Sequence, residues 1–250
     1  MDKIFSQTTF KGMAAAVADL VLPRVCVVCG RRLESFERHI CLECLADLPY
    51  SHFWRYARNP MADKYNERIR DDVRHGEGED YAFAAALLFY NSESPYRRIP
   101  QALKYESAKE QGRRFAARLG RLLASSEQFA DVDVVIPVPL HWRRRLSRGY
   151  NQAELIAVEI ASELGAQINA AVLRRRKFTR TQTRILVGEK ASNVSDAFVA
   201  KGPLSARHIL LVDDTFTTGS TLAACHNALR EIVPSTVRIS VATLSYVRVS

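Results

Sequence analysis

The sequence predicts an α/β protein in which a parallel β-sheet flanked by helices follows a small cysteine-containing module. Three observations support this fold class. From Tyr81 onward, apolar segments of strand length alternate with amphipathic segments of helix length. Four cysteines are confined to positions 26–44. The chain of 250 residues is 47% hydrophobic, which suits a globular protein with one sizeable core and a small appendage.

We divide the chain into three parts. Residues 1–60 hold an N-terminal helix and the cysteine module, 61–80 a polar linker or lid, and 81–250 the α/β domain. Asp19 interrupts the apolar run "FKGMAAAVADLVLP", so we expect an amphipathic helix there and not a signal peptide. No apolar run approaches the roughly 20 residues that a membrane-spanning helix needs, and we expect a cytoplasmic protein.

The four N-terminal cysteines are spaced as two C-x2-C pairs. They are Cys26, Cys29, Cys41 and Cys44. Each pair offers two thiolates from one tight turn, as tetrahedral zinc requires, and Gly30 frees the backbone to form the first turn. Four thiolates leave no position for substrate, so the expected zinc ion is structural. The alternatives are reduced core cysteines or, in an exported protein, two disulfides. Cys225 is expected to be a buried apolar residue.

The expected elements after the cysteine module follow from apolar periodicity and from Pro and Gly positions. Phe53, Trp54 and Tyr56 form an aromatic cluster that we expect to pack onto a neighbouring domain, a base-stacking platform being the alternative. Strands are expected at 81–90, 133–139, 170–176, 208–214 and 236–247, and helices within 94–126, 149–165 and 219–233. Pro100 marks the start of the first helix or a break in it, Asn151 caps the second and Gly165 ends it.

The segment "ILLVDDTFTTGST" (209–221) carries the strongest functional signal. Its apolar strand ends in Asp213 and Asp214, and ligands of parallel sheets bind beyond such strand ends. The hydroxyl-rich turn and the helix start that follow offer N–H and O–H donors to a phosphate, and Gly219 allows close approach. No lysine lies in the turn, which excludes a P-loop. A sugar diol on the paired acids, beside a phosphate monoester, fits this arrangement; a metal-binding acid pair or a helix cap with a spare carboxylate is the alternative.

The same segment resembles the phosphoribosyl pyrophosphate (PRPP) motif of type I phosphoribosyltransferases. Together with "VVIPVPLHWRRRLSRGYNQAELIA", "RRRKFTRTQTRILVGEKASNVSDAF" and the cysteine module, it is similar to the ComF family across nearly the whole chain. That family joins a zinc-ribbon-like N-terminus to a phosphoribosyltransferase fold, and some members act in competence for DNA uptake. A more distant likeness is to the transferase domain of glutamine amidophosphoribosyltransferase.

The resemblance implies roles for individual residues. Asp213 and Asp214 would bind the ribose hydroxyls at the catalytic centre. The 5′-phosphate would be held by Thr215, Thr217, Thr218, Gly219, Ser220 and Thr221. Residues 137–140 take the place of the pyrophosphate-binding turn. Pyrophosphate would also meet cations from the next segment and from a flexible loop at 174–193: Arg143, Arg144, Arg145, Arg148, Lys177 and Arg180. Lys104 and Tyr105 match a position common in the family. Solvent-exposed charge is the alternative for each cation.

The implied ligands are PRPP with Mg²⁺, in addition to structural Zn²⁺. Magnesium would be held largely through the substrate oxygens. The formal net charge of +9 also favours polyanionic partners such as single-stranded DNA. Three functions therefore stay open: transfer of a phosphoribosyl group to an unidentified acceptor, nucleotide or PRPP sensing without turnover, and single-strand binding in competence. No residue of the sequence is identifiable as a general base.

Overall fold

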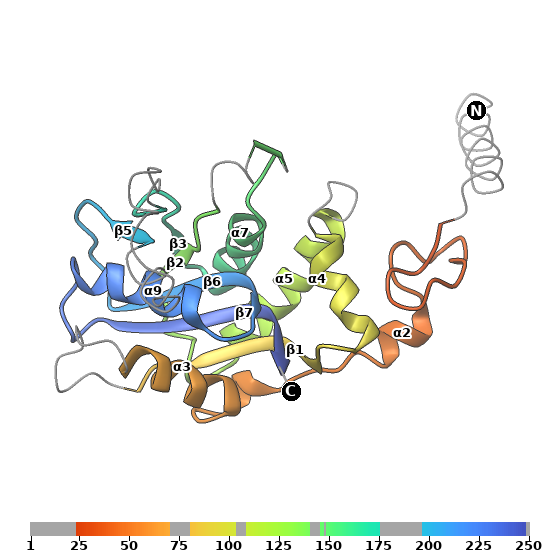
Figure 1. Ribbon diagram of the computed structural model, residues 1–250, viewed down its shortest axis with the longest axis horizontal. Coiled ribbons are helices and arrows are strands. Elements are labelled where there is room, and N and C mark those ends of the chain that lie inside the picture. The colour runs from red at the N-terminus through yellow and green to blue at the C-terminus, as the bar shows by residue number, and fades with distance from the viewer. Residues whose placement is uncertain are drawn as a thin grey trace, which may run out of the picture.

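The computed structural model describes residues 24–70, 81–103, 109–140, 146–147, 149–175 and 197–248. Their main element is a five-stranded, wholly parallel sheet with the order β1-β7-β6-β2-β3 (Figure 1). The strands are β1 (Ala84–Asn91), β2 (Val134–Pro137), β3 (Gln167–Ile168), β6 (His208–Phe216) and β7 (Arg238–Arg248). The predicted α/β class is confirmed, and the strand that carries the two aspartates is the central one.

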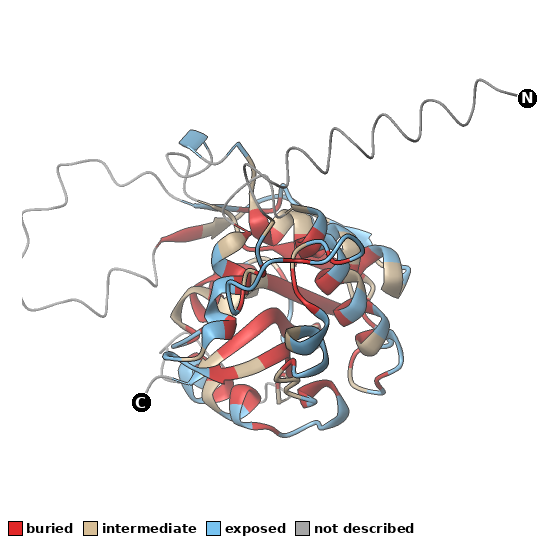
Figure 2. Cartoon of the chain, turned by 90° about the vertical axis from the view of Figure 1, so that its right-hand side faces the viewer, coloured by how far each residue is buried: buried red, intermediate tan, exposed pale blue. Residues whose placement is uncertain are grey.

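Helices cover both faces of this sheet. On one face lie α4 (Arg98–Ala102), α5 (Lys109–Ala124) and α7 (Gln152–Leu164). On the other lie α3 (Pro60–Arg70) and α9 (Ser220–Arg230). Successive residues of β6 divide between the two cores, because strand side chains alternate between faces: Leu210 packs with the first group and Leu211 with the second. The strands and the inward helix faces are accordingly buried (Figure 2).

The strand expected at 170–176 lies outside the main sheet. It forms β4 (Leu173–Arg175), which pairs antiparallel with β5 (Phe198–Ala200) in a separate two-stranded sheet. Only Leu173 is buried in β4, whereas Arg174 and Arg175 are exposed. A three-residue strand with one apolar side chain cannot be buried on both faces, as an inner strand of a parallel sheet must be.

The cysteine module, residues 24–48, packs against the body of the molecule at the end where α4 lies (Figure 1). It contains α2 (Leu42–Ala46), and Val28, Leu33 and Leu48 join the same core as α5 and α7. The chain then runs alongside β1, at the edge of the sheet, where Tyr50 and Leu88 form an antiparallel β-bridge. The apolar core is thus continuous from the cysteine module to the sheet.

Two of the three residues of the aromatic cluster, Phe53 and Trp54, are packed as predicted. Phe53 and Trp54 lie in the 3₁₀ helix η1 (Phe53–Arg55) and are buried, each in a different core, so neither ring is available for base stacking. Phe53 contacts Phe89 and Tyr246 with ring-centre distances of 5.6 and 5.8 Å. Tyr56 is exposed.

The first ten residues of the segment expected as a polar linker, 61–70, are helical and belong to α3. Proline occupies the first position of this helix, and Asn59 Oδ1 accepts hydrogen bonds from the N–H groups of Met61 and Ala62 at 3.1 and 3.0 Å. Tyr65 and Ile69 are buried on the same side as Met61. Apolar residues at i, i+4 and i+8 make one helix face, although the average composition is polar. Residues 71–80 lie outside the described residues.

Two helix-cap predictions are confirmed. Asn151 Oδ1 accepts a hydrogen bond from Ala153 N–H at 3.2 Å, and Gly165 ends α7 in the left-handed conformation with φ +66°. The helical region expected at 94–126 is divided into the 3₁₀ helix η2 (Pro95–Arg97), α4 and α5. Within the described residues, no helix has both the length and the apolar character needed to cross a bilayer.

Candidate ligand pocket and metal centre

The sheet topology fixes where a ligand can bind. After β2 the chain passes through α7 to β3 on one side, and after β6 it passes through α9 to β7 on the other. The connections from these two neighbouring strands therefore diverge, which opens a crevice beyond their carboxyl ends. Asp213 and Asp214 lie at the end of β6, and residues 137–140 follow directly from β2.

A pocket of about 480 Å³ occupies this crevice. Its volume lies in the range typical of small-molecule sites. Asp213, Asp214, Thr215, Thr217 and Thr221 all line it, as do Val138, Pro139 and Leu140. Thr218, Gly219 and Ser220 belong to the same turn but do not line the pocket. The structure thus brings together most of the residues that the resemblance singled out within the described part of the chain.

The two aspartates interact through a hydrogen bond and through their charges. Asp213 Oδ1 accepts a hydrogen bond from Asp214 N–H at 2.8 Å. Burial raises the pKa of Asp213 well above its usual range, and the charge of Asp214 raises it further. That hydrogen bond and the Arg175 guanidinium act in the opposite direction. Without a ligand, Asp213 therefore keeps its proton to a higher pH than an exposed aspartate does.

The turn at residues 217–221 is held in shape before any ligand is present. Gly219 has φ +77°, and a Cβ there would lie 2.6 Å from Cζ of Phe216, so both conformation and space require glycine. Lys64 Nζ, on α3, donates a hydrogen bond to the Thr217 carbonyl at 2.8 Å. Helix α9 begins at Ser220 with no acidic residue in its first turn, so no charge within that turn opposes the positive end of its dipole.

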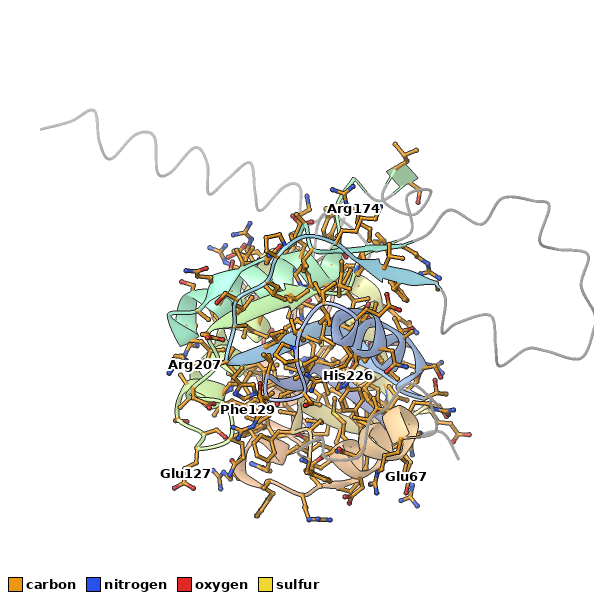
Figure 3. All side chains as sticks on the ribbon, turned by 90° about the vertical axis from the view of Figure 1, so that its left-hand side faces the viewer. Glu67, Glu127, Phe129, Arg174, Arg207 and His226 are labelled. Atoms are coloured by element: carbon orange, nitrogen blue, oxygen red, sulfur yellow. The ribbon has the colours of Figure 1, made fainter. Side chains whose placement is uncertain are left out.

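Beneath this turn, α9 is anchored to α3 in the interior. His226 Nδ1 and the Tyr65 hydroxyl are 2.8 Å apart, and both side chains are buried. Burial lowers the pKa of His226 to about 3, so the imidazole is neutral near pH 7. His226 lies well inside the molecule, whereas Arg174 lies at its periphery (Figure 3). Cys225 is fully buried, as predicted.

The side chain of Asn151 connects the segment that follows β2 to the start of α7. Asn151 Nδ2 donates a hydrogen bond to the Val138 carbonyl at 3.0 Å while its Oδ1 caps α7. Arg175 lines this pocket and also an adjoining one of about 290 Å³, which Arg174 lines as well. Arg175 lies over the ring of Phe198, with Cζ 5.3 Å from the ring centre. A cationic extension of the pocket therefore starts beside residues 137–140.

Several predicted site residues lie outside the described residues. They are Arg143, Arg144, Arg145, Arg148, Lys177 and Arg180, together with Lys104 and Tyr105. Conversely, the pocket includes Tyr90, Arg97 and Gln101, which the sequence did not identify. They come from β1 and the η2–α4 segment, and no local sequence signal places those elements beside β6. Lys64 was missed because α3 was read as a linker.

The four N-terminal cysteines converge on one point. Their Sγ atoms all lie within 4.8 Å of one another, and those of Cys29 and Cys41 are 3.8 Å apart. Tetrahedral zinc with Zn–S bonds of about 2.3 Å separates its sulfurs by roughly 3.8 Å, so the group fits the ion. All five cysteines of the chain are free of disulfides. The predicted four-thiolate module is thus supported by geometry, with Gly30 in the left-handed conformation at φ +77°.

The surroundings of the cysteines act differently on Cys26 and Cys44. Burial raises the pKa of Cys26, but N–H donors from Cys29, Cys41 and Val28 outweigh it and bring the pKa down to about 7. Burial and the neighbouring thiols raise the pKa of Cys44, so a cation is needed for all four to ionise together. Between the two cysteine pairs, the buried Glu37 carboxylate accepts hydrogen bonds from the N–H groups of Glu34 and Leu42 at 2.8 and 2.7 Å. No sequence pattern indicated this role of Glu37.

The chain is similar in sequence to known proteins over most of its length. It is 34% identical over 224 residues to DNA utilization protein YhgH of Escherichia coli O157:H7, which covers 86% of this chain and 88% of that protein. It is 36% identical over 103 residues to Competence protein F of Haemophilus influenzae, covering 40% of this chain and 45% of that protein. A YhgH protein of Salmonella typhi is 30% identical over 152 residues, covering 58% of this chain and 65% of that protein. No protein-family model matches the chain.

Proposed function

The chain belongs to the ComF family, and from this premise we propose that it binds PRPP with Mg²⁺ and transfers the phosphoribosyl group to an acceptor, releasing pyrophosphate. One observation supports the proposal most directly. The acid pair, the glycine-dependent 217–221 turn and residues 137–140 line or border one pocket at the divergence of β2 and β6. A site that bound only a phosphate would have no need of two adjacent carboxylates. A ribose diol, in contrast, has two hydroxyl groups that can each donate a hydrogen bond to one of the two carboxylates.

Each part of the pocket has a task in this proposal. Asp213 and Asp214 accept hydrogen bonds from the ribose hydroxyls. The 217–221 turn and the start of α9 bind the 5′-phosphate, and residues 137–140 with Arg175 meet the pyrophosphate. Magnesium, when bound through substrate oxygens, would neutralise pyrophosphate charge. Because the diol binds ionised carboxylates, ligand binding should lower the pKa of Asp213, which burial raises in the free protein.

The reaction is a substitution at C1 of the ribose. The bond from C1 to the pyrophosphate oxygen breaks and pyrophosphate leaves with the electron pair. The nucleophile forms its bond to C1 and releases its proton to water. Positive charge develops on the ribose ring, so the nearby carboxylates stabilise the transition state electrostatically. No described residue is assigned as a general base, and the acceptor is not assigned. The cations at 143–145, 148, 177 and 180 remain predicted pyrophosphate contacts.

Calorimetry with PRPP and Mg²⁺ tests the pocket. The wild-type protein should bind, and the double variant Asp213→Asn, Asp214→Asn should bind at least about 100-fold more weakly, because two charged hydrogen-bond acceptors are lost. Asn keeps the size of each side chain, so the fold should be unaffected. Equal affinity in the double variant would remove the pocket assignment. Pyrophosphate release on addition of candidate acceptors then separates a transferase from a sensor that binds without turnover.

A second candidate function is binding of single-stranded DNA. It is favoured by the names of the relatives, which refer to DNA utilization and competence, and by the net charge of +9. Phosphate contacts release counterions, so affinity for a short single strand should fall steeply with salt and decrease when Arg174 and Arg175 are neutralised. A flat salt response contradicts this function. Four clustered cysteines without disulfides are compatible with the cytoplasm, which we propose as the location of the protein.

A further inference from the structure

The η2–α4 segment, residues 95–103, lies between the cysteine module and the ligand pocket. It consists of one 3₁₀ turn and a helix of five residues. Such short helices are marginal by themselves and take their stability from neighbouring contacts. The residues that hold this segment therefore decide the position of every group it carries.

On one side, the segment contacts both cysteine pairs through their backbone carbonyls. Arg98 Nη1 donates a hydrogen bond at 2.9 Å to the carbonyl of Val28, which lies between Cys26 and Cys29. The Tyr96 hydroxyl donates to the carbonyl of Cys44 at 3.4 Å and lies 3.2 Å from Oδ2 of Asp47. The two carbonyls belong to the two turns that present the thiolates. Their positions consequently depend on the geometry of the metal centre.

On its other side, the same segment lines the pocket with Arg97, Pro100 and Gln101. Its last residue reaches the opposite wall: the Leu103 carbonyl accepts hydrogen bonds from the Tyr150 hydroxyl and from Nε2 of Gln152, the latter at 3.1 Å. Gln152 and its neighbour Asn151 line the pocket beside residues 137–140. A shift of the segment is therefore transmitted to two walls of the pocket.

We propose that the zinc module positions the ligand pocket, with residues 95–103 as the connecting brace and Arg98 as the positioning residue that joins it to the first cysteine pair. This inference rests on the proposed PRPP pocket for its functional consequence. Loss of zinc releases the carbonyls of Val28 and Cys44, frees the brace and lowers ligand affinity, although no cysteine touches the pocket.

The test compares two arginines that both connect the module to the body. Arg98→Ala removes the contact with Val28. Arg38→Ala is the matched control, because Arg38 pairs with Glu110 on α5 at 3.5 Å on the exposed surface, away from the pocket. Both variants keep all four cysteines, and metal analysis should find about one zinc per chain in each. Hydrogen exchange is measured on the zinc-loaded full chain and after chelation, and PRPP affinity by calorimetry.

We expect exchange in residues 95–103 and 150–153 to quicken about fivefold in Arg98→Ala and PRPP affinity to fall by a similar factor, the effect of one lost hydrogen bond. Chelation should quicken exchange in the same two segments. Arg98→Lys should recover part of both effects, because an ammonium can also donate to one carbonyl. Arg38→Ala should match the wild type.

The outcomes separate the two proposals. Exchange at 95–103 that ignores both chelation and Arg98→Ala overturns the brace. Faster exchange with unchanged PRPP affinity also overturns it, because the segment would then be braced without positioning the pocket. If the wild type binds no PRPP but exchange responds as expected, the mechanical connection stands and the proposed function fails.

Discussion

The two ends of β6 both involve acidic side chains, but in opposite circumstances. At the amino end, His208 is almost fully buried, with Nδ1 2.6 Å from Asp131 and Nε2 2.8 Å from the Ser240 hydroxyl. Asp133 there accepts hydrogen bonds from the N–H groups of Arg207 and His208. At the carboxyl end, two adjacent carboxylates face a pocket and burial raises the pKa of Asp213.

The pKa values of the acids differ accordingly. Burial raises the pKa of Asp133, but backbone N–H donors, first those of Arg207 and His208, together with the Arg207 charge outweigh it and leave the pKa below its usual range. Among the described residues, one backbone N–H, that of Asp214, and the Arg175 guanidinium act against the raised pKa of Asp213, and they do not outweigh burial and the Asp214 charge. The acid at the amino end is thus compensated by groups of the folded chain, whereas we propose that a ligand compensates the acids at the carboxyl end. Buried carboxylates whose charge the surrounding hydrogen-bond donors do not compensate, in an otherwise consistent fold, are typical of functional sites.

The largest effect on stability is expected from His208→Ala. It removes a buried ring and leaves the Ser240 hydroxyl without that partner, so the free energy of unfolding should fall by about 3 kcal/mol. PRPP affinity should not change, because five residues of strand, roughly 16 Å, separate His208 from Asp213. Urea unfolding and calorimetry measure the two quantities. Arg207→Ala, an exposed neighbour, should alter stability by less than about 0.5 kcal/mol. A large loss of affinity in His208→Ala would contradict the separation of the two ends.

A smaller effect is expected from Gly219→Ala at the carboxyl end. Alanine at φ +77° costs about 1–2 kcal/mol, and its Cβ also displaces the Phe216 ring. Gly165→Ala is the control, since it has φ +66° and no atom within 4 Å of the added Cβ. Both variants should lose stability in urea, but only Gly219→Ala should also lose PRPP affinity, because its turn is distorted. Equal affinities in the two variants would show that the 217–221 turn does not bind the ligand.

The smallest effect is a pair of opposite pH dependences. The raised pKa of Asp213 gives the unliganded protein stability that is present at low pH and lost as the pH rises through that pKa. The lowered pKa of Asp133 gives stability that is present above the unfolded pKa of about 3.9 and lost as the pH falls through the folded pKa. Each slope stays below about 1.4 kcal/mol per pH unit, and solvent screening reduces that of Asp133.

Unfolding measured from pH 3 to 8 checks these signs. Asp213→Asn should remove the loss on the alkaline side and Asp133→Asn the loss on the acid side. Identical pH profiles for the two variants would mean that the two ends of β6 are electrostatically alike, which would contradict the opposite pKa shifts of Asp133 and Asp213.

Sequence reasoning located what local patterns encode. The apolar run before Asp213 identified the central strand, and the spacing of the cysteines identified a group whose sulfurs converge. It failed where average composition was allowed to outweigh periodicity: Met61, Tyr65 and Ile69 form one buried helix face within a polar segment. With α3 unrecognised, the contact of Lys64 with the 217–221 turn could not be anticipated.

Other features depend on tertiary structure alone. Arg97 and Gln101 line the pocket because β1 pairs beyond β7, an arrangement without a local signature. The placement of β4 outside the main sheet follows from its pairing with a strand more than twenty residues later in the chain. The division of the chain at residues 60 and 80 remains a prediction, although α3 already packs on the sheet.

The position of β1 in the sheet has a consequence for biosynthesis. Its partner is β7, with Ala84 opposite Val241, so the ribosome must synthesise all the residues between these two strands before β1 can pair. Until then, only segments synthesised earlier can cover the apolar side chains of β1. The bridge between Tyr50 and Leu88 can form as soon as both residues have left the ribosome. The cysteine module closes through contacts short in sequence and can fold soon after it leaves the exit tunnel. Translation should therefore yield a metal-bound amino terminus that waits for the sheet, and truncations before residue 238 should aggregate on release.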